Sequence, residues 1–220
     1  MRSTFVATAM LLCAGLVSAQ DAKTAGVTPE EAKEGFVSLF DGKTLGGWQG
    51  AVKGYAIEDG AMVCKPGGNV YTTKEYANFI LRFEFKLPPA GNNGLAIRYP
   101  GKGDTAYVGM CELQILDDSS PKYAALDPRQ YTGSIYGVVP AHRGYLRPVG
   151  EWNIEHVTVR GSVITVELNG TVIVNGDVSK ATEFMGNKEH PGLTRTRGFF
   201  GFAGHNEPVQ YRNVSIKKLN

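Results

Sequence analysis

The sequence predicts an all-β fold built from two packed antiparallel sheets. Short runs of alternating apolar and polar residues are separated by turns rich in glycine, proline, aspartate and asparagine. About ten such runs fit into the chain, and helical periodicity is nearly absent after the N-terminal region. No repeat of fixed period is visible. Together these observations favour a two-sheet sandwich over a barrel or a propeller.

Residues 1–19 have the pattern of an export signal. Arg2 supplies a positive charge, residues 5–17 are largely apolar, and Val17-Ser18-Ala19 offers small residues for cleavage. We therefore expect cleavage near Ala19 and a periplasmic or secreted protein. The apolar run is shorter than the roughly 18 to 20 residues of a membrane-spanning helix, and no later segment approaches that length, so no membrane span is expected.

The next segment, residues 20–34, is expected to form a spacer and a short helix. Thr28-Pro29-Glu30-Glu31 combines an N-cap, a proline at the first helical position and a capping-box glutamate. The helix should run through Lys33. Residues 35–220 then form one β domain, which is large enough to bury a continuous core.

The strands of this domain are predicted from alternation and turns. Residues 79–87 place five apolar side chains on one face and charged ones on the other, and Asn169-Gly170 is typical of a two-residue hairpin turn. In chain order, strands are expected at residues 55–57, 61–64, 79–87, 94–99, 109–116, 134–138, 152–160, 163–168, 171–174, 198–203 and 209–218.

Charge and cysteine content restrict the classes of partner. The chain has 23 basic and 21 acidic residues, which argues against nucleic-acid binding by bulk charge. Cys64 and Cys111 both lie in strand-like apolar contexts, so a disulfide and two buried thiols both remain open. No CxxC pair or zinc-site spacing is present.

The segment CELQILDD, residues 111–118, carries the most information about function. Alternation places Glu112 and Gln114 on one face of a strand and Leu113 and Ile115 on the other. The run NNGLAIR, residues 92–98, puts Arg98 on the face opposite its leucine and isoleucine. If the two strands share a sheet, a carboxylate, an amide and a guanidinium meet on one surface.

Seven motifs in order resemble the 3-keto-disaccharide hydrolase family. They are FVSLFDGKTLGGW (36–48), NNGLAIR (92–98), ELQILDD (112–118), TGSIYG (132–137), GEWN (150–153), LNG (168–170) and GFFGFAGHNEPVQYRNVSIKKL (198–219). The resemblance implies a concanavalin A-like jelly roll of the lectin and glucanase type. It also implies an exported enzyme that cleaves sugars already oxidised at C3 by a separate sugar 3-dehydrogenase, its expected functional partner.

Such a substrate fits the residues of these motifs. A ketone at C3 acidifies the proton at C2, so a base can remove it, the aglycone can leave C1 by β-elimination, and water can add back. We expect Glu112 to be the base and Arg98 to hold the enolate oxygen, unless Arg98 merely pairs with Glu112. His205, in GHNEP, is the candidate for a second acid or base.

Three further residues are candidate sugar ligands. Gln114 shares the face of Glu112, Tyr136 in TGSIYG could donate a hydrogen bond or stack on a sugar, and His142 lies in a loop that could cover the site. We expect no required cofactor, although a divalent cation such as calcium remains open. Asp117 and Asp118 are weak candidates to hold a divalent cation such as calcium together with Glu112, the alternative being a solvated turn.

Two other functions compete with this hypothesis. Laminarinase-type hydrolases of the same fold place two acids on one strand face, in the pattern Glu-x-Asp-x-x-Glu. Here Gln114 replaces the middle acid, and Asp117 falls on the opposite face of a regular strand. A non-catalytic carbohydrate-binding module is the second alternative, because fold alone does not establish activity.

Overall fold

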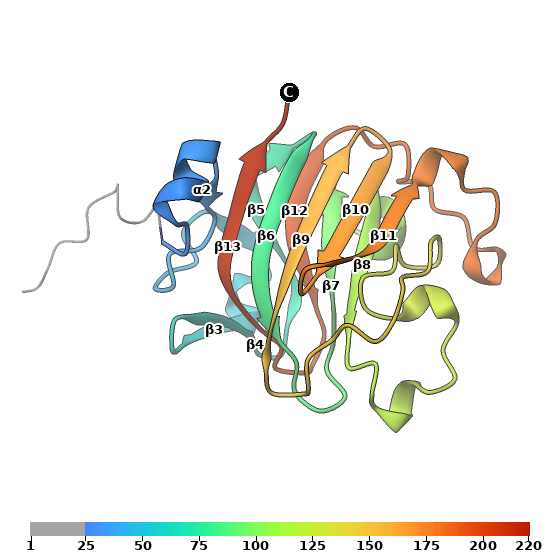
Figure 1. Cartoon of the computed structure of the whole chain (residues 1–220), viewed down its shortest axis with the longest axis horizontal. Coiled ribbons are helices and arrows are strands. Elements are labelled where there is room, and N and C mark those ends of the chain that lie inside the picture. The colour runs from blue at the N-terminus through green and yellow to red at the C-terminus, as the bar shows by residue number, and fades with distance from the viewer. Residues whose placement is uncertain (1–24) are drawn as a thin grey trace, which may run out of the picture.

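The structure, a computed structural model, describes residues 25–220 and confirms the two antiparallel sheets. The predicted signal peptide and its cleavage point lie outside the described residues. In Figure 1 the larger sheet lies in front of the smaller one, and the long loops gather at one side of the sandwich. Among residues 25–220, no helix is long and apolar enough to cross a membrane.

The larger sheet has eight strands in the order β11-β10-β9-β6-β13-β4-β3, with β1 paired to β13. Its strands are β1 (Val37–Ser38), β3 (Tyr55–Glu58), β4 (Ala61–Cys64), β6 (Phe79–Lys86), β9 (Trp152–Arg160), β10 (Val163–Leu168), β11 (Thr171–Asp177) and β13 (Gln210–Lys218).

The smaller sheet has five strands in the order β2-β5-β12-β7-β8. Its strands are β2 (Trp48–Gly50), β5 (Gly68–Tyr76), β7 (Asn92–Tyr99), β8 (Cys111–Leu116) and β12 (Gly198–Gly204). The helix α2 (Pro29–Glu34) precedes β1. Short helices also lie between strands: η1 (Val52–Gly54), α3 (Thr105–Val108), η2 (Pro121–Tyr123), η3 (Pro128–Gln130), η4 (Val178–Lys180) and η5 (Met185–Asn187).

Local signals in the sequence correctly predicted the first helix and the hairpin. Thr28 caps α2, and the side chain of Glu31 accepts a hydrogen bond from the Thr28 amide at 2.8 Å, which completes the capping box. Asn169 and Gly170 both have positive φ angles, 51° and 87°, as the two-residue turn between β10 and β11 requires.

The strand prediction was wrong at residues 134–138, and it missed the short strands β1 and β2 as well as β5. Residues 134–138 form no strand, since Ile135 makes only isolated bridges to Leu113 and Val139. The nine-residue strand β5 was not predicted, because its exposed Thr73-Lys74-Glu75 run interrupts the alternation. β5 nevertheless pairs with β2 and β12, so its place depends on its neighbours in the sheet.

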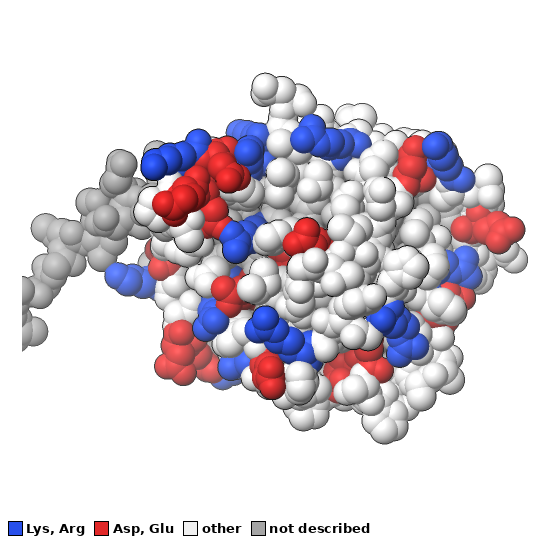
Figure 2. Space-filling view, viewed as in Figure 1, with Lys and Arg blue, Asp and Glu red and all other residues white. Residues whose placement is uncertain are grey.

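Aromatic and aliphatic side chains from both sheets form the core. Phe83 of β6 and Phe202 of β12 meet edge to face at 6.0 Å, and Phe202 stacks on Tyr211 of β13 at 3.7 Å. Cys64 and Cys111 are buried free thiols, which resolves the alternative left open by the sequence. Acidic and basic side chains are interspersed on the face shown in Figure 2, with no large patch of one sign.

Candidate active site

The outer face of the smaller sheet carries the predicted polar pair. On β8, Glu112 and Gln114 point away from the core, whereas Leu113 and Ile115 belong to it. In β7 the register partners of this pair are Ala96 and Gly94. A Cβ atom at Gly94 would lie 2.2 Å from Oε1 of Glu112, so only glycine at this position leaves room for the carboxylate.

A pocket of about 450 Å³ opens above these two residues. Strands, α3 and three loops contribute its lining, which comprises Asn69, Asn92, Asp104, Thr105, Ala106, Tyr107, Glu112, Gln114, Leu116, Tyr123, Leu126, Gln130, Tyr136, Lys188, Ala203, Gly204 and His205. It therefore combines polar and aromatic groups over a floor that includes small residues. This mixture is typical of a site for a small polar ligand.

Glu112 is the most perturbed acid of the pocket. Its side chain is buried, with only 6% exposed, and the hydroxyl of Thr105 donates a hydrogen bond to Oε2. Burial raises the pKa of Glu112 to about 7, with a smaller upward effect from Asp104, while the Thr105 hydrogen bond acts in the opposite direction. A carboxyl group with this pKa is well matched to proton transfer near neutral pH.

Lys188 and α3 form one wall of the pocket, and neither was predicted from the sequence. The ammonium nitrogen of Lys188 lies 3.3 Å from the ring centroid of Tyr107, close enough for a cation–π interaction. Asp104 caps α3 by accepting a hydrogen bond from the Ala106 amide. The N-cap at Asp104 was a usable signal for this helix, but Lys188 lies in a loop without periodicity.

Gln114 and Tyr136, two of the predicted sugar ligands, both line the pocket. Gln114 donates through Nε2 to Oδ1 of Asn92 at 3.0 Å, and the hydroxyl oxygen of Tyr136 accepts from Nε2 of Gln130 at 2.9 Å. The Tyr136 hydroxyl keeps its own hydrogen for a ligand. Burial raises the pKa of Tyr136, so this group remains a donor at neutral pH.

The two predicted histidines differ in position. His205 lies on the rim of the pocket with an exposed side chain, and its backbone oxygen accepts a weak hydrogen bond from the thiol of Cys64 at 3.2 Å. His142 does not line the pocket. Its amide donates to the carbonyl oxygen of Ile173, and this pairing directs the loop toward β11.

Arg98 does not line the pocket, so the structure supports neither its predicted contact with the enolate oxygen nor the alternative, a pairing with Glu112. The register of β7 against β12 runs from Ala96 to Tyr99 opposite Gly201 to Phe199, so β7 has one extra residue there. At this bulge Arg98 adopts a φ of 49°, and its side chain leaves the face of Glu112. Only 2% of Arg98 is exposed, and its guanidinium group donates to backbone carbonyls in place of a carboxylate.

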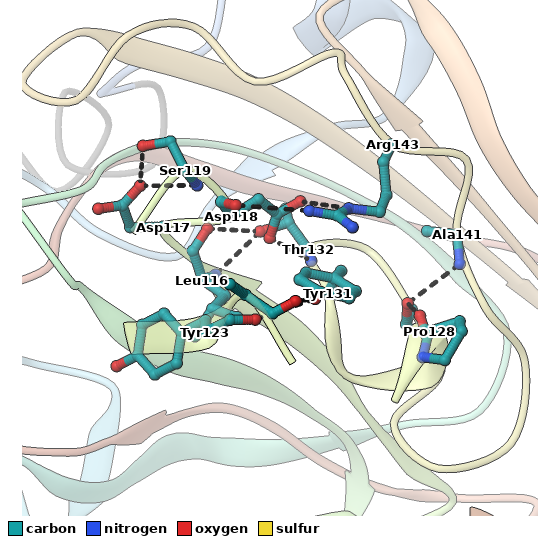
Figure 3. Close-up of polar contacts among 12 residues, drawn as sticks. Leu116, Asp117, Asp118, Ser119, Tyr123, Pro128, Tyr131, Thr132, Ala141 and Arg143 are labelled. Carbon is teal, nitrogen blue, oxygen red and sulfur yellow. Dashed lines mark hydrogen bonds and ion pairs between the residues drawn. The ribbon is translucent and has the colours of Figure 1, made fainter. Parts of the chain in front are cut away.

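Asp117 and Asp118 do not share a ligand set with Glu112. Asp117 accepts hydrogen bonds from the Ala90 and Ser119 amides. Asp118 accepts one from the Thr132 amide, and Figure 3 shows this contact together with the one from Ser119. Both border a separate pocket. Within residues 25–220 no group of three or more His, Cys, Asp or Glu residues is arranged to hold a metal ion, so the proposed trio is not formed.

Comparison with known proteins identifies the family. The family defined as the 3-keto-alpha-glucoside-1,2-lyase-like domain matches residues 35–217. The chain belongs to this family. The match covers both sheets except Lys218, and it covers every residue lining the pocket, so the pocket is part of the family domain.

Relatives of the 3-keto-alpha-glucoside-1,2-lyase-like family agree in fold. A protein of Bacteroides thetaiotaomicron named 3-keto-disaccharide hydrolase is 27% identical, covering 85% of this chain and 79% of the relative. Two structures from Parabacteroides distasonis, each described as a "putative glycosyl hydrolase", superpose with TM-scores of 0.76. They are 28% and 26% identical, covering 88% and 84% of this chain and 98% and 99% of theirs. The fold is thus the expected jelly-roll sandwich.

Proposed function

We propose that this carbohydrate-active protein is an exported enzyme that cleaves 3-keto-glycosides. The observation that carries the proposal is a single buried carboxyl group, Glu112, with a pKa near 7 in a polar pocket that also contains an ammonium group. The name of the relative from B. thetaiotaomicron supports the substrate class. The ketone would be supplied by a separate enzyme that oxidises the sugar at C3.

In the first step the carboxylate of Glu112 takes the proton from C2 of the sugar. The electron pair of the C–H bond forms the enolate of the C3 ketone, whose negative charge needs a nearby donor or cation. Lys188 and the hydroxyl of Tyr136, both in the pocket lining, take this role in place of Arg98. A preorganised donor of this kind contributes roughly 10² to 10³ in rate.

In the second step the enolate collapses and the bond from C1 to the aglycone oxygen breaks. This leaves a double bond between C1 and C2, conjugated with the C3 ketone, and an alkoxide that must receive a proton. His205, on the rim, is the proposed donor. Addition of water at C1 and return of a proton to C2 complete a net hydrolysis.

A direct test offers purified protein 3-keto-trehalose and trehalose in parallel. The proposal predicts cleavage of the keto sugar and no cleavage of the parent sugar. Binding of either sugar without turnover, measured by calorimetry, would instead assign the protein to the non-catalytic binding modules.

A second candidate function is favoured by one observation. Asp104 lines the same pocket as Glu112, so two acids are present even though Asp117 is not one of them. A conventional glycosidase uses two carboxyl groups on either side of the bond. Asp104 is already engaged as the N-cap of α3, which makes it a poor partner. Cleavage of unoxidised trehalose, lost in Asp104→Asn, would establish this function.

A further inference from the structure

The segment 188–195 is fastened to the end of α3 by three consecutive carbonyl groups. The carbonyl oxygens of Ala106, Tyr107 and Val108 accept hydrogen bonds from His190 Nδ1 at 3.0 Å, the Gly192 amide at 2.9 Å and Arg195 Nε at 2.6 Å, respectively. The last carbonyls of a helix have no partner within the helix. The segment 188–195 therefore supplies the hydrogen-bond donors that the last carbonyl groups of α3 lack within the helix.

The tautomer, burial and ring packing of His190 all suit its hydrogen bond to the carbonyl oxygen of Ala106. A carbonyl oxygen only accepts, so Nδ1 of His190 must carry the hydrogen. The ring is buried, with 6% exposed, and it packs on Tyr107 at 4.7 Å and Phe184 at 5.2 Å between ring centroids. Burial lowers the pKa of His190, so the imidazole is neutral at physiological pH.

The approach of the segment to α3 is too close for any side chain at its centre. A Cβ atom at Gly192 would lie 1.8 Å from the backbone oxygen of Gly109 and 2.5 Å from that of Val108. Glycine at 192 is thus required by space alone. At Gly192 the backbone of the segment therefore packs directly against the backbone of Val108 and Gly109.

Arg98 holds the far end of the same segment. Its Nη1 donates to the carbonyl oxygens of Arg195 at 2.8 Å and Gly161 at 2.9 Å, and its Nε and Nη2 donate to that of Ala77 at 2.9 and 2.7 Å. None of the ion pairs found among residues 25–220 includes Arg98. One buried guanidinium group therefore ties three loops together through neutral acceptors.

At the near end of the segment, Lys188 reaches the pocket. Its ammonium nitrogen lies over Tyr107, the same ring on which His190 packs. We propose that Arg98 and His190 are positioning residues, which fasten the segment 188–195 to α3 and so keep Lys188 over Tyr107 in the sugar pocket. The effect on catalysis rests on the proposed function, whereas the fastening itself does not.

Limited trypsin digestion tests the fastening without any substrate. The segment offers two cleavable bonds, after Lys188 and after Arg195, and mass spectrometry identifies each cut. His190→Ala and Arg98→Met are expected to be cut at these bonds about tenfold faster than the wild type, because local opening sets the rate of cleavage. Arg160→Met, an exposed arginine beside the Gly161 turn, is the control and should match the wild type.

Conservative replacement separates positioning from general stability. His190→Asn places an amide donor near the position of Nδ1 and should restore protection from trypsin in part, whereas His190→Ala should not. Thermal unfolding identifies variants that simply fail to fold. If Arg98→Met fails to fold, the comparison of His190→Ala with His190→Asn decides the outcome. Cleavage of His190→Ala at the wild-type rate would overturn the proposal.

Kinetics on 3-keto-trehalose then test whether the fastening acts through Lys188. His190→Ala should lower kcat by about tenfold or more with a smaller change in KM, since the cation acts on the enolate. The double variant Lys188→Met/His190→Ala should lose no more than Lys188→Met alone. Additive losses would overturn the link to Lys188. Absence of turnover in the wild type would reject the proposed function but leave the protease result valid.

Discussion

Each sheet of the sandwich buries one glutamate, and the two residues differ in what they can reach. Glu112 on β8 and Glu155 on β9 are 6% and 0% exposed. Burial raises the pKa of Glu112 to about 7 and that of Glu155 to about 8. By the shift alone, Glu155 would be the better candidate for a functional residue.

The surroundings of the two side chains make Glu112, and not Glu155, the better candidate for a functional residue. Glu112 accepts a hydrogen bond from Thr105 and lines the pocket. The oxygens of Glu155 have no hydrogen-bond partner within residues 25–220, and its register partners are Phe83 and Leu168 in the core. A perturbed pKa marks a catalytic group only where a ligand can reach it.

The largest expected effect separates the two glutamates by activity. Glu112→Gln should lower kcat/KM for a 3-keto-glycoside by about 10³-fold or more, because it removes the base. Glu155→Gln should stay within about twofold of the wild type when folded, since Glu155 does not touch the pocket. Comparable losses of kcat/KM in Glu112→Gln and Glu155→Gln would show that the two glutamates do not differ in function.

The second effect concerns stability, where both raised pKa values act in the same direction and the larger shift of Glu155 contributes more than that of Glu112. The pKa of Glu155 is raised in the folded state above the ordinary value of 4.5, so the folded protein keeps a proton that the unfolded chain loses. Stability should fall as pH rises from about 4.5 to about 8, by a few kcal/mol, and then level off. In Glu155→Gln this part of the fall should vanish. Urea unfolding of both proteins between pH 5 and 9 measures the difference.

A third prediction concerns Lys188, the cation that lines the same pocket as Glu112. Lys188→Met should lower kcat by about 10²-fold with a smaller change in KM, because the ammonium group acts mainly on the enolate. Lys53→Met, an exposed lysine of η1, serves as the matched control. Equal kinetics for the two variants would remove Lys188 from the mechanism.

The smallest effect concerns the hydroxyl of Thr105, which donates a hydrogen bond to Glu112 and has no counterpart at Glu155 among the described residues. Thr105→Val deletes a hydrogen bond to the carboxylate form, so the pKa of Glu112 should rise and the ascending limb of kcat/KM should move to higher pH. Activity at pH 6 should drop several-fold and recover near pH 9. Thr105→Ser retains the hydroxyl and should keep the wild-type profile; an unmoved limb in Thr105→Val would exclude this role.

Local patterns in the sequence predicted much of the fold and part of the pocket lining. Alternation along β8 was sufficient to place Glu112 and Gln114 on one face, and the same rule failed at Arg98 because one extra residue in β7 reverses the side chain. No local pattern marks such a bulge. Lys188 and Thr105 were missed because a loop and α3, respectively, bring them into the pocket, and neither position follows from the alternation of a strand.

Exchange at C2 of the sugar tests the central claim, that Glu112 removes this proton, most directly. A 3-keto-glucoside is incubated in deuterium oxide with wild-type protein or with Glu112→Gln, and deuterium at C2 of the product is measured by NMR. The account predicts deuterium at C2 with the wild type and neither exchange nor cleavage above background with Glu112→Gln. Exchange and cleavage by Glu112→Gln at the wild-type rate would contradict it.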